Sequence, residues 1–466
     1  MINKFVKKFV GDRAFYKMAF MVAAPMIVQN GITNFVGLLD NIMVGRIGTE
    51  QMSGVSIVNN LLFVFNIFIF GAVAAPGIFT AQFFGRGDQK GVRDTLRFKY
   101  LSAFFFCITG IVLFLLCGDS LIGLYLNDGA STGNVEETLI YAKKYLLVML
   151  SGLIPFTLTH IYASTLREGG ETGVPMRAGI IAVFVNLIGN YLLIFGKFGF
   201  PELGVQGAAL ATVISRFVEC AIVMIWTHKN TQKNPFAVGL FRHFSIPGKL
   251  AWDILKKGTP LMLNEGIWAI GIAVINQGYS LRGLEVVAGF NIANTLLNLT
   301  NVVYLTMGSA VGIIIGQLLG AGKMEEARDK DNKLIALSVF SCAIMGLILV
   351  CLAPVFPKLY VTSDEVRDIA TKIMWVAAAN MPMHAYMHAS YFTLRSGGKT
   401  GITFLFDSGF LWIATVPTVF ILSRYTQMPI IPLYICAAVS ELVKLVGGYI
   451  LVKRGDWLQN IVEHEN

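Results

Sequence analysis

This sequence contains few charged residues. Only 14% of its 466 residues are charged, whereas a soluble domain carries about a quarter. Instead, 55% of the residues are hydrophobic, and long apolar runs alternate with short polar segments. This composition excludes an ordinary soluble domain and predicts an integral membrane protein that crosses the bilayer many times.

Cysteine is also scarce, and its positions exclude a disulfide-stabilised secreted protein. All six cysteines lie within apolar stretches, so we expect them to pack between helices without forming a disulfide framework. The basic N-terminal segment is followed by an apolar run, residues 18–39, which exceeds a signal-peptide core and lacks a small-residue cleavage site. We therefore expect this run to be retained as the first span.

Hydropathy predicts twelve membrane-spanning helices. A hydrocarbon core of about 30 Å needs roughly 20 apolar residues per helix. The expected spans are residues 17–40, 54–80, 98–118, 138–160, 175–196, 205–227, 259–281, 287–316, 334–354, 368–393, 401–423 and 430–452. The predicted fold class is therefore an all-α polytopic membrane protein.

The basic residues predict the orientation of these spans. Most of the 37 Lys and Arg fall in loops on the same side of the membrane as the two termini, and basic loops mark the cytoplasmic side. Because this topology accounts for the formal net charge of +9, we expect no nucleic-acid partner. A polar linker at residues 229–257 separates a lobe of residues 1–228 from a second lobe of residues 258–466, which ends in a short cytoplasmic tail.

The two lobes are internal repeats. The segment Gly48–Leu62 aligns with Gly283–Leu297, and Thr165–Gly173 aligns with Thr393–Gly401. Other residues stay in register: Pro25 with Pro260, Asn66 with Asn301, Gln82 with Gln317, Gly85 with Gly320 and His160 with His388. Each repeat has an even number of spans, which predicts a pseudo-two-fold axis along the membrane normal. Such parallel repeats are typical of transporters, whose site lies between the halves near mid-depth.

Three carboxylates lie within predicted spans without an obvious adjacent basic residue: Asp40, Glu265 and Asp407. An unpaired ionisable group in the bilayer is costly and usually functional. Glu265 and Asp407 each lie about 9–11 Å along their helices from the cytoplasmic end. If these helices are neighbours, the two carboxylates would face one cavity. The alternative is that each is only hydrogen-bonded within the helix packing.

Asp40 lies closer to the outer interface, where a solvated carboxylate is also a sufficient explanation. Polar residues elsewhere in the first lobe favour a binding site, because Asn186 and Asn190 are four residues apart and share one helix face. Oxygen atoms of Asp and Asn suit a hard cation. A buried carboxylate that binds Na⁺ can equally bind H⁺.

Two pairs of opposite charges within the spans have a simpler explanation. Arg216 with Glu219, and Glu441 with Lys444, are each three residues apart. Side chains at this spacing are neighbours on a helix surface. We therefore expect each pair to neutralise itself.

His384 and His388 are four residues apart, which suits a metal site, but such a site needs a third or fourth ligand. We expect these histidines to pack or to line a polar cavity. Trp268 lies three residues after Glu265 and could stack on a flat or cationic ligand, or it could face lipid. A membrane-embedded enzyme would need a convergent cluster of His, Cys or acidic residues at one interface, which this sequence does not offer.

The sequence resembles the MATE (multidrug and toxic compound extrusion) family of secondary antiporters over nearly its whole length. The resemblance rests on the early segment AAPMIVQNGITNFVGLLDNIMVGRIGTEQMSGVSI and on two repeated pairs, AQFFGRGD with GQLLGAGK and LREGGET with LRSGGKT. It implies two six-helix lobes that form a V around a cavity opening alternately to each side. It also implies a transporter without cofactors, and not an enzyme.

The resemblance assigns roles to individual residues. Asp40 matches the first-helix aspartate of the N-terminal lobe, and Asn186 and Asn190 stand where its fifth-helix Asn or Asp partners occur. Glu265 and Asp407 match the carboxylates that the NorM-like branch uses for Na⁺ binding and coupling, whereas DinF-like members generally lack that Glu. Some relatives have Asp in place of Asn190, which disfavours a proton relay in this lobe.

We therefore expect a monomeric antiporter of the cell membrane that exports organic, amphipathic cations or drugs in exchange for Na⁺ or H⁺, with a slight preference for Na⁺. The expected substrate-binding residues are Glu265, Asp407, Trp268 and Asp40. The first alternative is a flippase of the same superfamily for a lipid-linked oligosaccharide. It would need a cavity rich in Arg and Lys, whereas basic residues within the spans are few.

Overall fold

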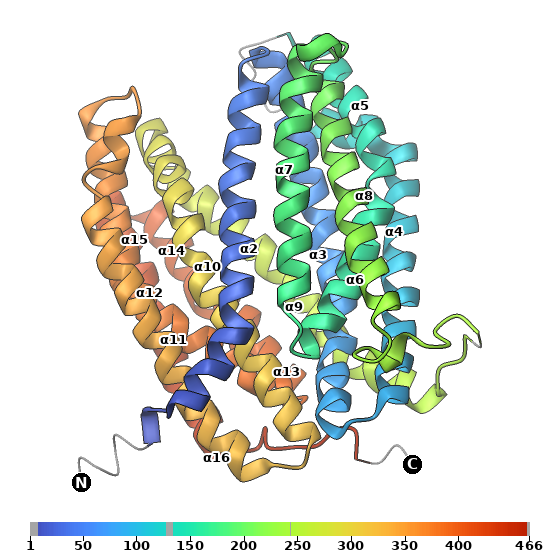
Figure 1. Ribbon diagram of the computed structural model, residues 1–466. Helices are drawn as coiled ribbons and strands as arrows, with labels where there is room; N and C mark the ends of the chain where they lie inside the picture. Colours follow the sequence, from blue (N-terminus) through green and yellow to red (C-terminus); the bar gives the residue numbers. More distant parts are fainter. Residues whose placement is uncertain (1–7, 127–133, 243, 464–466) are drawn as a thin grey trace. The chain divides into compact units, whose positions relative to one another are not determined.

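The computed structural model describes residues 8–126, 134–242 and 244–463, and helices form most of this part of the chain (Figure 1). The first half holds α2 (Arg13–Gly45), α3 (Thr49–Arg86), α4 (Gln89–Leu126), α5 (Val135–Ser151), α6 (Leu153–Glu168), α7 (Gly173–Phe195) and α8 (Val205–Lys229). The second half holds α9 (Gly248–Ser280), α10 (Leu284–Gly320), α11 (Met324–Leu352), α12 (Asp364–Ser396), α13 (Thr400–Phe404), η4 (Leu405–Gly409), η5 (Leu411–Thr415), α14 (Val416–Tyr425), α15 (Ile430–Ser440) and α16 (Leu442–Arg454). Short 3₁₀ turns are η1 (Lys197–Gly199), η2 (Pro235–Ala237) and η3 (Phe356–Leu359), and the described residues contain no strand.

Each of the twelve predicted spans falls on one of these helices or helix runs, which confirms the all-α polytopic membrane fold. Ten are long and apolar enough to cross a membrane, and the bent pair α5 and α6 adds an eleventh. Helix α12, which covers the predicted tenth span, is not among them. It is 33 residues long, and its buried face packs into the hydrophobic core of the second half through Ala378 and Met381.

Three predicted spans are not regular α-helices. The predicted fourth span bends by 46° between α5 and α6, at Gly152, where a side chain would approach Val213 to 2.9 Å. The eleventh passes through two π-helical segments, η4 and η5. The twelfth is interrupted between α15 and α16 at Glu441. π-Helical turns are rare overall but are common at functional sites. The irregular eleventh and twelfth spans are therefore candidate positions for a functional site.

The chain divides into two compact units, and neither is continuous in sequence. The first unit consists of Met1–Ile27, Ala81–Asp88 and Trp252–Asn466, and the second consists of Val28–Thr80 and Gln89–Ala251. Each unit has its own hydrophobic core. Helices α2 and α3 contribute residues to both units. The lobe boundaries predicted at residues 228 and 258 stay a prediction.

Within the first unit, the ends of α3 and α10 cross at equivalent positions of the sequence repeat. A side chain on Gly85 would overlap the backbone carbonyl of Gln317, and one on Gly320 would overlap the carbonyl of Gln82. Glycine allows such a close approach of two backbones. The repeat thus conserves a reciprocal helix contact, and not only a matching hydropathy pattern.

The segment after α16 packs against this crossing. Gln82 donates to the carbonyl of Ser396 at 2.9 Å and accepts from the backbone N–H of Ile461 at 2.8 Å. Arg86 donates to the carbonyl of Val462 at 2.6 Å. The indole of Trp457 is buried, so the end of the described chain is an ordered part of the first unit.

Candidate functional site

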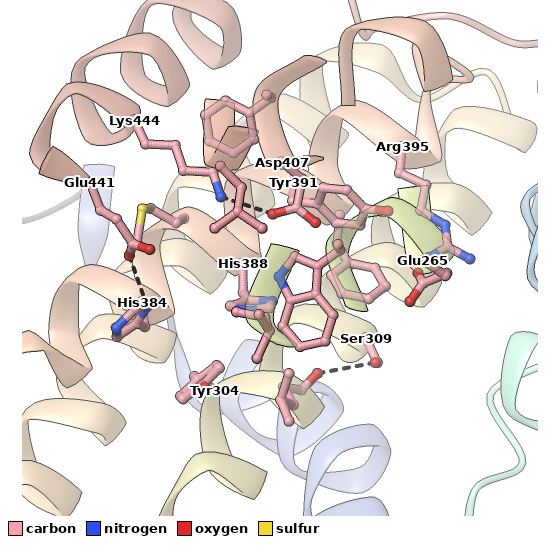
Figure 2. Close-up of a pocket in the computed structure, with 17 residues that line it drawn as sticks. Glu265, Tyr304, Ser309, His384, His388, Tyr391, Arg395, Asp407, Glu441 and Lys444 are labelled. Atoms are coloured by element: carbon pink, nitrogen blue, oxygen red, sulfur yellow. Dashed lines mark hydrogen bonds and ion pairs between the residues drawn. The ribbon is translucent and has the colours of Figure 1, made fainter. Parts of the chain in front are cut away.

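A cavity of about 480 Å³ lies within the first unit, between helices of the second half of the chain. Its lining residues come from α9 (Glu265, Trp268, Ile272), α10 (Tyr304, Leu305, Ser309), α12 (His384, Met387, His388, Tyr391, Phe392, Arg395), the π-helical region (Phe406, Asp407, Leu411) and the twelfth span (Glu441, Lys444). Figure 2 shows Glu265 and Arg395 at one end of the cavity, His384 and Glu441 at the other, and Asp407 with Lys444 between them. The structure therefore places Glu265, Asp407 and Trp268 on one cavity, as the sequence predicted for neighbouring helices.

Asp407 lies inside the π-helical turn η4 and is held there by Asn264 of α9. The Asn264 amide nitrogen donates to Asp407 Oδ2 at 3.0 Å. The amide oxygen accepts from the backbone N–H of Ser408 at 3.2 Å and from the Ser408 hydroxyl at 2.7 Å. Asn264 is buried, and a buried polar group needs such partners to offset its desolvation. The clamp fixes the Asp407 carboxylate and joins α9 to the π-helical turn.

The second oxygen of Asp407 is paired with Lys444 of α16. Lys444 Nζ donates to Asp407 Oδ1 at 2.8 Å, and it also lies 5.6 Å from the centre of the Phe406 ring. This contact corrects two sequence predictions. Asp407 does have a basic partner, and Lys444 pairs with it and not with Glu441. The reason is tertiary, because the interruption of the twelfth span at Glu441 brings α16 against η4.

Glu441 pairs with a different residue. One of its oxygens lies 3.8 Å from Nδ1 of His384. His384 and His388 both pack against the ring of Tyr304, at centroid distances of 5.7 and 4.8 Å. The two histidines therefore line the cavity, one of the two roles that the sequence predicted. The residues that the structure describes contain no cluster of three or more His, Cys, Asp or Glu side chains that could hold a metal ion.

Trp268 is 39% exposed and contributes to the same cavity wall as Glu265. Both residues lie on α9, within one helical turn of each other, so they share a face of that helix. The indole of Trp412 donates to the backbone carbonyl of Ile267 at 3.0 Å, which ties this stretch of α9 to the π-helical segment η5. The flat ring of Trp268 is thus available to a ligand beside a carboxylate.

A second polar site lies in the other unit, around Asp40 of α2. Asn190 of α7 donates to Asp40 Oδ1 at 2.6 Å. With the Asn186 amide oriented to satisfy both of its polar atoms, its nitrogen lies 3.0 Å from each Asp40 oxygen, and its oxygen accepts from Thr212 Oγ1 at 3.1 Å. Both asparagines are buried. The structure therefore brings together the three residues that the sequence singled out in the first lobe.

Arg216 and Glu219 do not form the predicted ion pair among the residues that the structure describes. Arg216 donates to the carbonyl of Gly152 at 3.4 Å and lies over the ring of Phe156, 4.8 Å from its centre. It therefore stabilises the bend between α5 and α6. The spacing of three residues places opposite charges on one helix face but does not decide which partner each side chain takes.

Two partners of Asp407 were not predicted from the sequence: Asn264, which donates to it, and Lys444, which forms an ion pair with it. Asn264 directly precedes Glu265, so its side chain points to a different helix face, and only packing shows that this face meets η4. Lys444 carried a signal, because a lysine within a span needs a partner. That signal pointed to Glu441, the nearest carboxylate in the sequence, whereas Lys444 pairs in space with Asp407.

Known proteins are similar to this chain along most of its length. A family model described as MatE matches residues 25–192 and residues 267–419, one match in each half of the chain. The chain is 26% identical over 449 residues to a probable multidrug resistance protein NorM of Thermotoga maritima, and the alignment covers 95% of this chain and 93% of that protein. It is 23% identical over 436 residues to a probable multidrug resistance protein YoeA of Bacillus subtilis, with 91% of both chains covered.

Solved structures of the same fold are similar over nearly the whole chain. A crystal structure of MATE in complex with MaL6 has a TM-score of 0.85 at 18% identity, and it covers 97% of this chain and 98% of that chain. A MOP superfamily transporter from Pyrococcus furiosus has a TM-score of 0.85 at 19% identity, with the same coverage. Because the family model matches more than half of the sequence, and relatives named NorM align along almost its full length, this chain belongs to the MatE (multidrug and toxic compound extrusion) family of membrane transporters.

Proposed function

We propose that this protein is a secondary active antiporter of the cell membrane that exports organic, amphipathic cations in exchange for Na⁺ or H⁺. Both termini are cytoplasmic in this proposal, and lobes of residues 1–228 and 258–466 alternate access to the two sides as a monomer. The names of the relatives, which are called probable multidrug resistance proteins, support a drug-like cargo.

The observation that carries the proposal is the cavity around Glu265 and Asp407. It combines three carboxylates with the aromatic rings of Trp268, Tyr304 and other residues. Aromatic rings attract organic cations through their electron-rich faces, and carboxylates attract both these cations and Na⁺. One cavity can therefore bind either the cargo or the coupling ion.

The coupling follows from competition at these carboxylates. A cation that enters from outside neutralises the excess negative charge of the cavity and displaces the organic cation. The loaded site then reorients more readily, because burying a neutralised carboxylate costs less than burying a bare one. After the ion leaves on the inside, cargo binds again. The different affinities of the two ligands for the two states supply the coupling.

The charges of the cavity favour a cationic cargo over the pyrophosphate of a lipid-linked oligosaccharide. Lys444 and Arg395 are the cationic side chains among its lining residues, against the carboxylates of Glu265, Asp407 and Glu441. Lys444 is already paired with Asp407. A flippase would need an excess of positive charge at this place.

The Asp40 site of the other unit is proposed as a second cation site. Asp40 supplies carboxylate oxygens and the two asparagines supply amide oxygens, the atom types that suit a hard cation. In the structure the amide nitrogens of Asn186 and Asn190 face the carboxylate and orient it, so binding of a cation would require the amides to turn. Na⁺ is our preferred coupling ion, because each site combines acidic side chains with Asn amides, and such oxygen atoms suit a hard cation.

Efflux from proteoliposomes tests the proposal. A panel of cationic dyes and drugs is loaded, and an inward Na⁺ gradient and then a pH gradient are imposed separately. We expect Glu265→Gln and Asp407→Asn to abolish gradient-driven flux while the purified proteins stay monodisperse. Normal transport by both variants would overturn the proposal.

A further inference from the structure

The carboxylate of Asp407 already holds a cation that belongs to the protein. Lys444 Nζ lies 2.8 Å from Asp407 Oδ1, and the two side chains are 11% and 24% exposed. Both line the cavity in which a transported cation would bind. A ligand that reaches Asp407 from this cavity therefore meets an occupied carboxylate.

The two partners differ in how firmly they are held. Asp407 is short, lies in the π-helical turn η4, and accepts a second hydrogen bond from the buried amide of Asn264 at 3.0 Å. Lys444 carries its charge on a flexible stem of four carbons. If the ion pair opens, the lysine is the partner that moves.

A second carboxylate lies within reach of Lys444. Glu441 is three residues earlier in the sequence, at the junction of α15 and α16, and side chains at this spacing are neighbours on a helix surface. Glu441 also lines the cavity, and its only ion-pair partner among the described residues is His384, at the long distance of 3.8 Å. Figure 2 shows Lys444 between Glu441 and Asp407. The lysine thus has two acceptors on the wall of one cavity.

The formal charges of the lining residues agree with such an exchange. Three carboxylates and two cationic side chains line the cavity, so it carries an excess of one negative charge when both histidines are neutral. Uptake of one monovalent cation balances this charge, provided that Lys444 stays inside and does not withdraw its own charge to solvent. Transfer of Lys444 to Glu441 fulfils this condition.

We propose that Lys444 is a tethered competitor for the transported cation. With the cavity empty, Lys444 neutralises Asp407. A monovalent organic cation displaces it from Asp407, and Lys444 then pairs with Glu441 until the cation leaves. This inference rests on the proposed function and makes Lys444 and Glu441 determinants of the affinity for the transported cation.

The competition is tested by equilibrium binding of radiolabelled tetraphenylphosphonium to the purified protein, at a fixed pH of about 7.5. We expect Lys444→Met to tighten binding by about tenfold, the effect of removing one charge competitor worth roughly 1.4 kcal/mol. Lys444→Gln keeps a hydrogen-bond donor for Asp407 and is expected to tighten binding in the same direction if the Met variant does not fold. Lys444→Arg keeps the competing charge and should bind close to wild type. Lys453→Met, on the exposed face of the same helix, is the matched control.

The second acceptor is tested by a double-mutant cycle. Glu441→Gln should weaken binding by about tenfold, because the displaced lysine has no carboxylate to receive it. In the Lys444→Met background, the same Glu441→Gln change should have little effect. Additive effects would show that Glu441 attracts the ligand directly, and they would overturn the transfer of Lys444. Unchanged or weaker binding in both folded Lys444→Met and Lys444→Gln would overturn the competition itself.

The two proposals fail in different ways. If the wild-type protein binds no tetraphenylphosphonium and drives no efflux of any cation, the proposed function is overturned, and this inference with it. If the wild type binds and transports, but the cycle is additive, only the inference about Lys444 is overturned.

Discussion

Asp40 in one unit and Asp407 in the other each accept a hydrogen bond from a buried asparagine, at 2.6 Å from Asn190 and at 3.0 Å from Asn264. Their remaining partners differ. Asp40 faces a second neutral amide, Asn186, whereas Asp407 is paired with the ammonium group of Lys444. An aspartate is thus held by two neutral amides in one unit, and by an amide and an ammonium group in the other.

Because of this difference, the two sites should differ in the electrostatic attraction that a cation gains on binding. Neutral amides orient a carboxylate without cancelling its charge, so Asp40 gains the full attraction when a cation binds. At Asp407 a cation gains only the difference between its own attraction and that of Lys444. The arrangement at Asp40 favours tight binding of a cation, and the arrangement at Asp407 favours exchange of one cation for another.

The largest test of this contrast is to neutralise each aspartate in turn. We expect Asp407→Asn to abolish gradient-driven efflux, which means a loss of at least about 30-fold, because it removes a carboxylate for which cargo and coupling ion compete. Asp40→Asn should impair cycling less, by about tenfold, because it leaves no protein charge unpaired. Initial efflux rates from proteoliposomes measure both. Equal losses in the two variants would remove the distinction, and unchanged turnover of Asp40→Asn would reduce Asp40 to an interfacial residue.

The two asparagines should differ in their contribution to stability. Asn264→Ala removes the donor to Asp407 and leaves the backbone N–H of Ser408 without its acceptor, so we expect a loss of about 2–3 kcal/mol in the free energy of unfolding. Asn190→Ala should cost about 1–2 kcal/mol. Thermal unfolding of the purified proteins in detergent gives the order of the two effects. Asn332→Ala, whose amide donates to the carbonyl of Arg328 in its own helix, serves as the control.

A smaller effect is expected from the aromatic wall of the Asp407 cavity. Trp268→Ala should weaken tetraphenylphosphonium binding by about fivefold, the size of a contact between a cation and an aromatic ring of roughly 1 kcal/mol. Trp268→Phe should retain most of the affinity. Trp375 lies on α12 and is similarly exposed, at 45%, but it does not line the cavity, so Trp375→Ala controls for the loss of a surface indole. A loss of equal size in the control would assign Trp268 to lipid contact.

The smallest expected effect concerns the outer partner of the Asp40 site. Thr212→Val removes the hydroxyl that donates to Asn186 at 3.1 Å and keeps the shape of the side chain. We expect the free energy of unfolding to fall by about 1 kcal/mol or less, with binding at the Asp407 cavity unchanged. Thr212→Ser, which keeps the hydroxyl, should unfold close to wild type. A change in ligand affinity at the cavity would show that the two sites are coupled.

Much of the fold was predictable because the bilayer imposes simple rules on a sequence. Apolar runs of the right length marked helices at all twelve predicted positions, since backbone groups in hydrocarbon must bond within their own segment. The irregular segments were not predictable. Nothing in the residues around Asp407 distinguishes a π-helical turn from an α-helix. One of the partners of this turn, the amide of Asn264 that accepts from the backbone N–H of Ser408, comes from another helix.

The acidic residues of both sites were also predictable, because an ionisable group in a span is costly enough to stand out. The partners of these acidic residues were predictable only where a single helix supplies both partners of one carboxylate. Asn186 and Asn190 share a face of α7 and meet Asp40 together. Lys444 lies beside Glu441 in sequence, yet it pairs with Asp407.

The amino-acid sequence is sufficient to predict the class of protein, the positions of the spans, the internal repeat, and the carboxylates that fall within spans. These follow from composition and spacing, which act along one chain. That Glu265, Asp407 and Glu441 line one cavity can be seen only in the folded structure. The same holds for the ion pair between a lysine and Asp407. Charges pair with the nearest partner in space, and helix packing sets those distances.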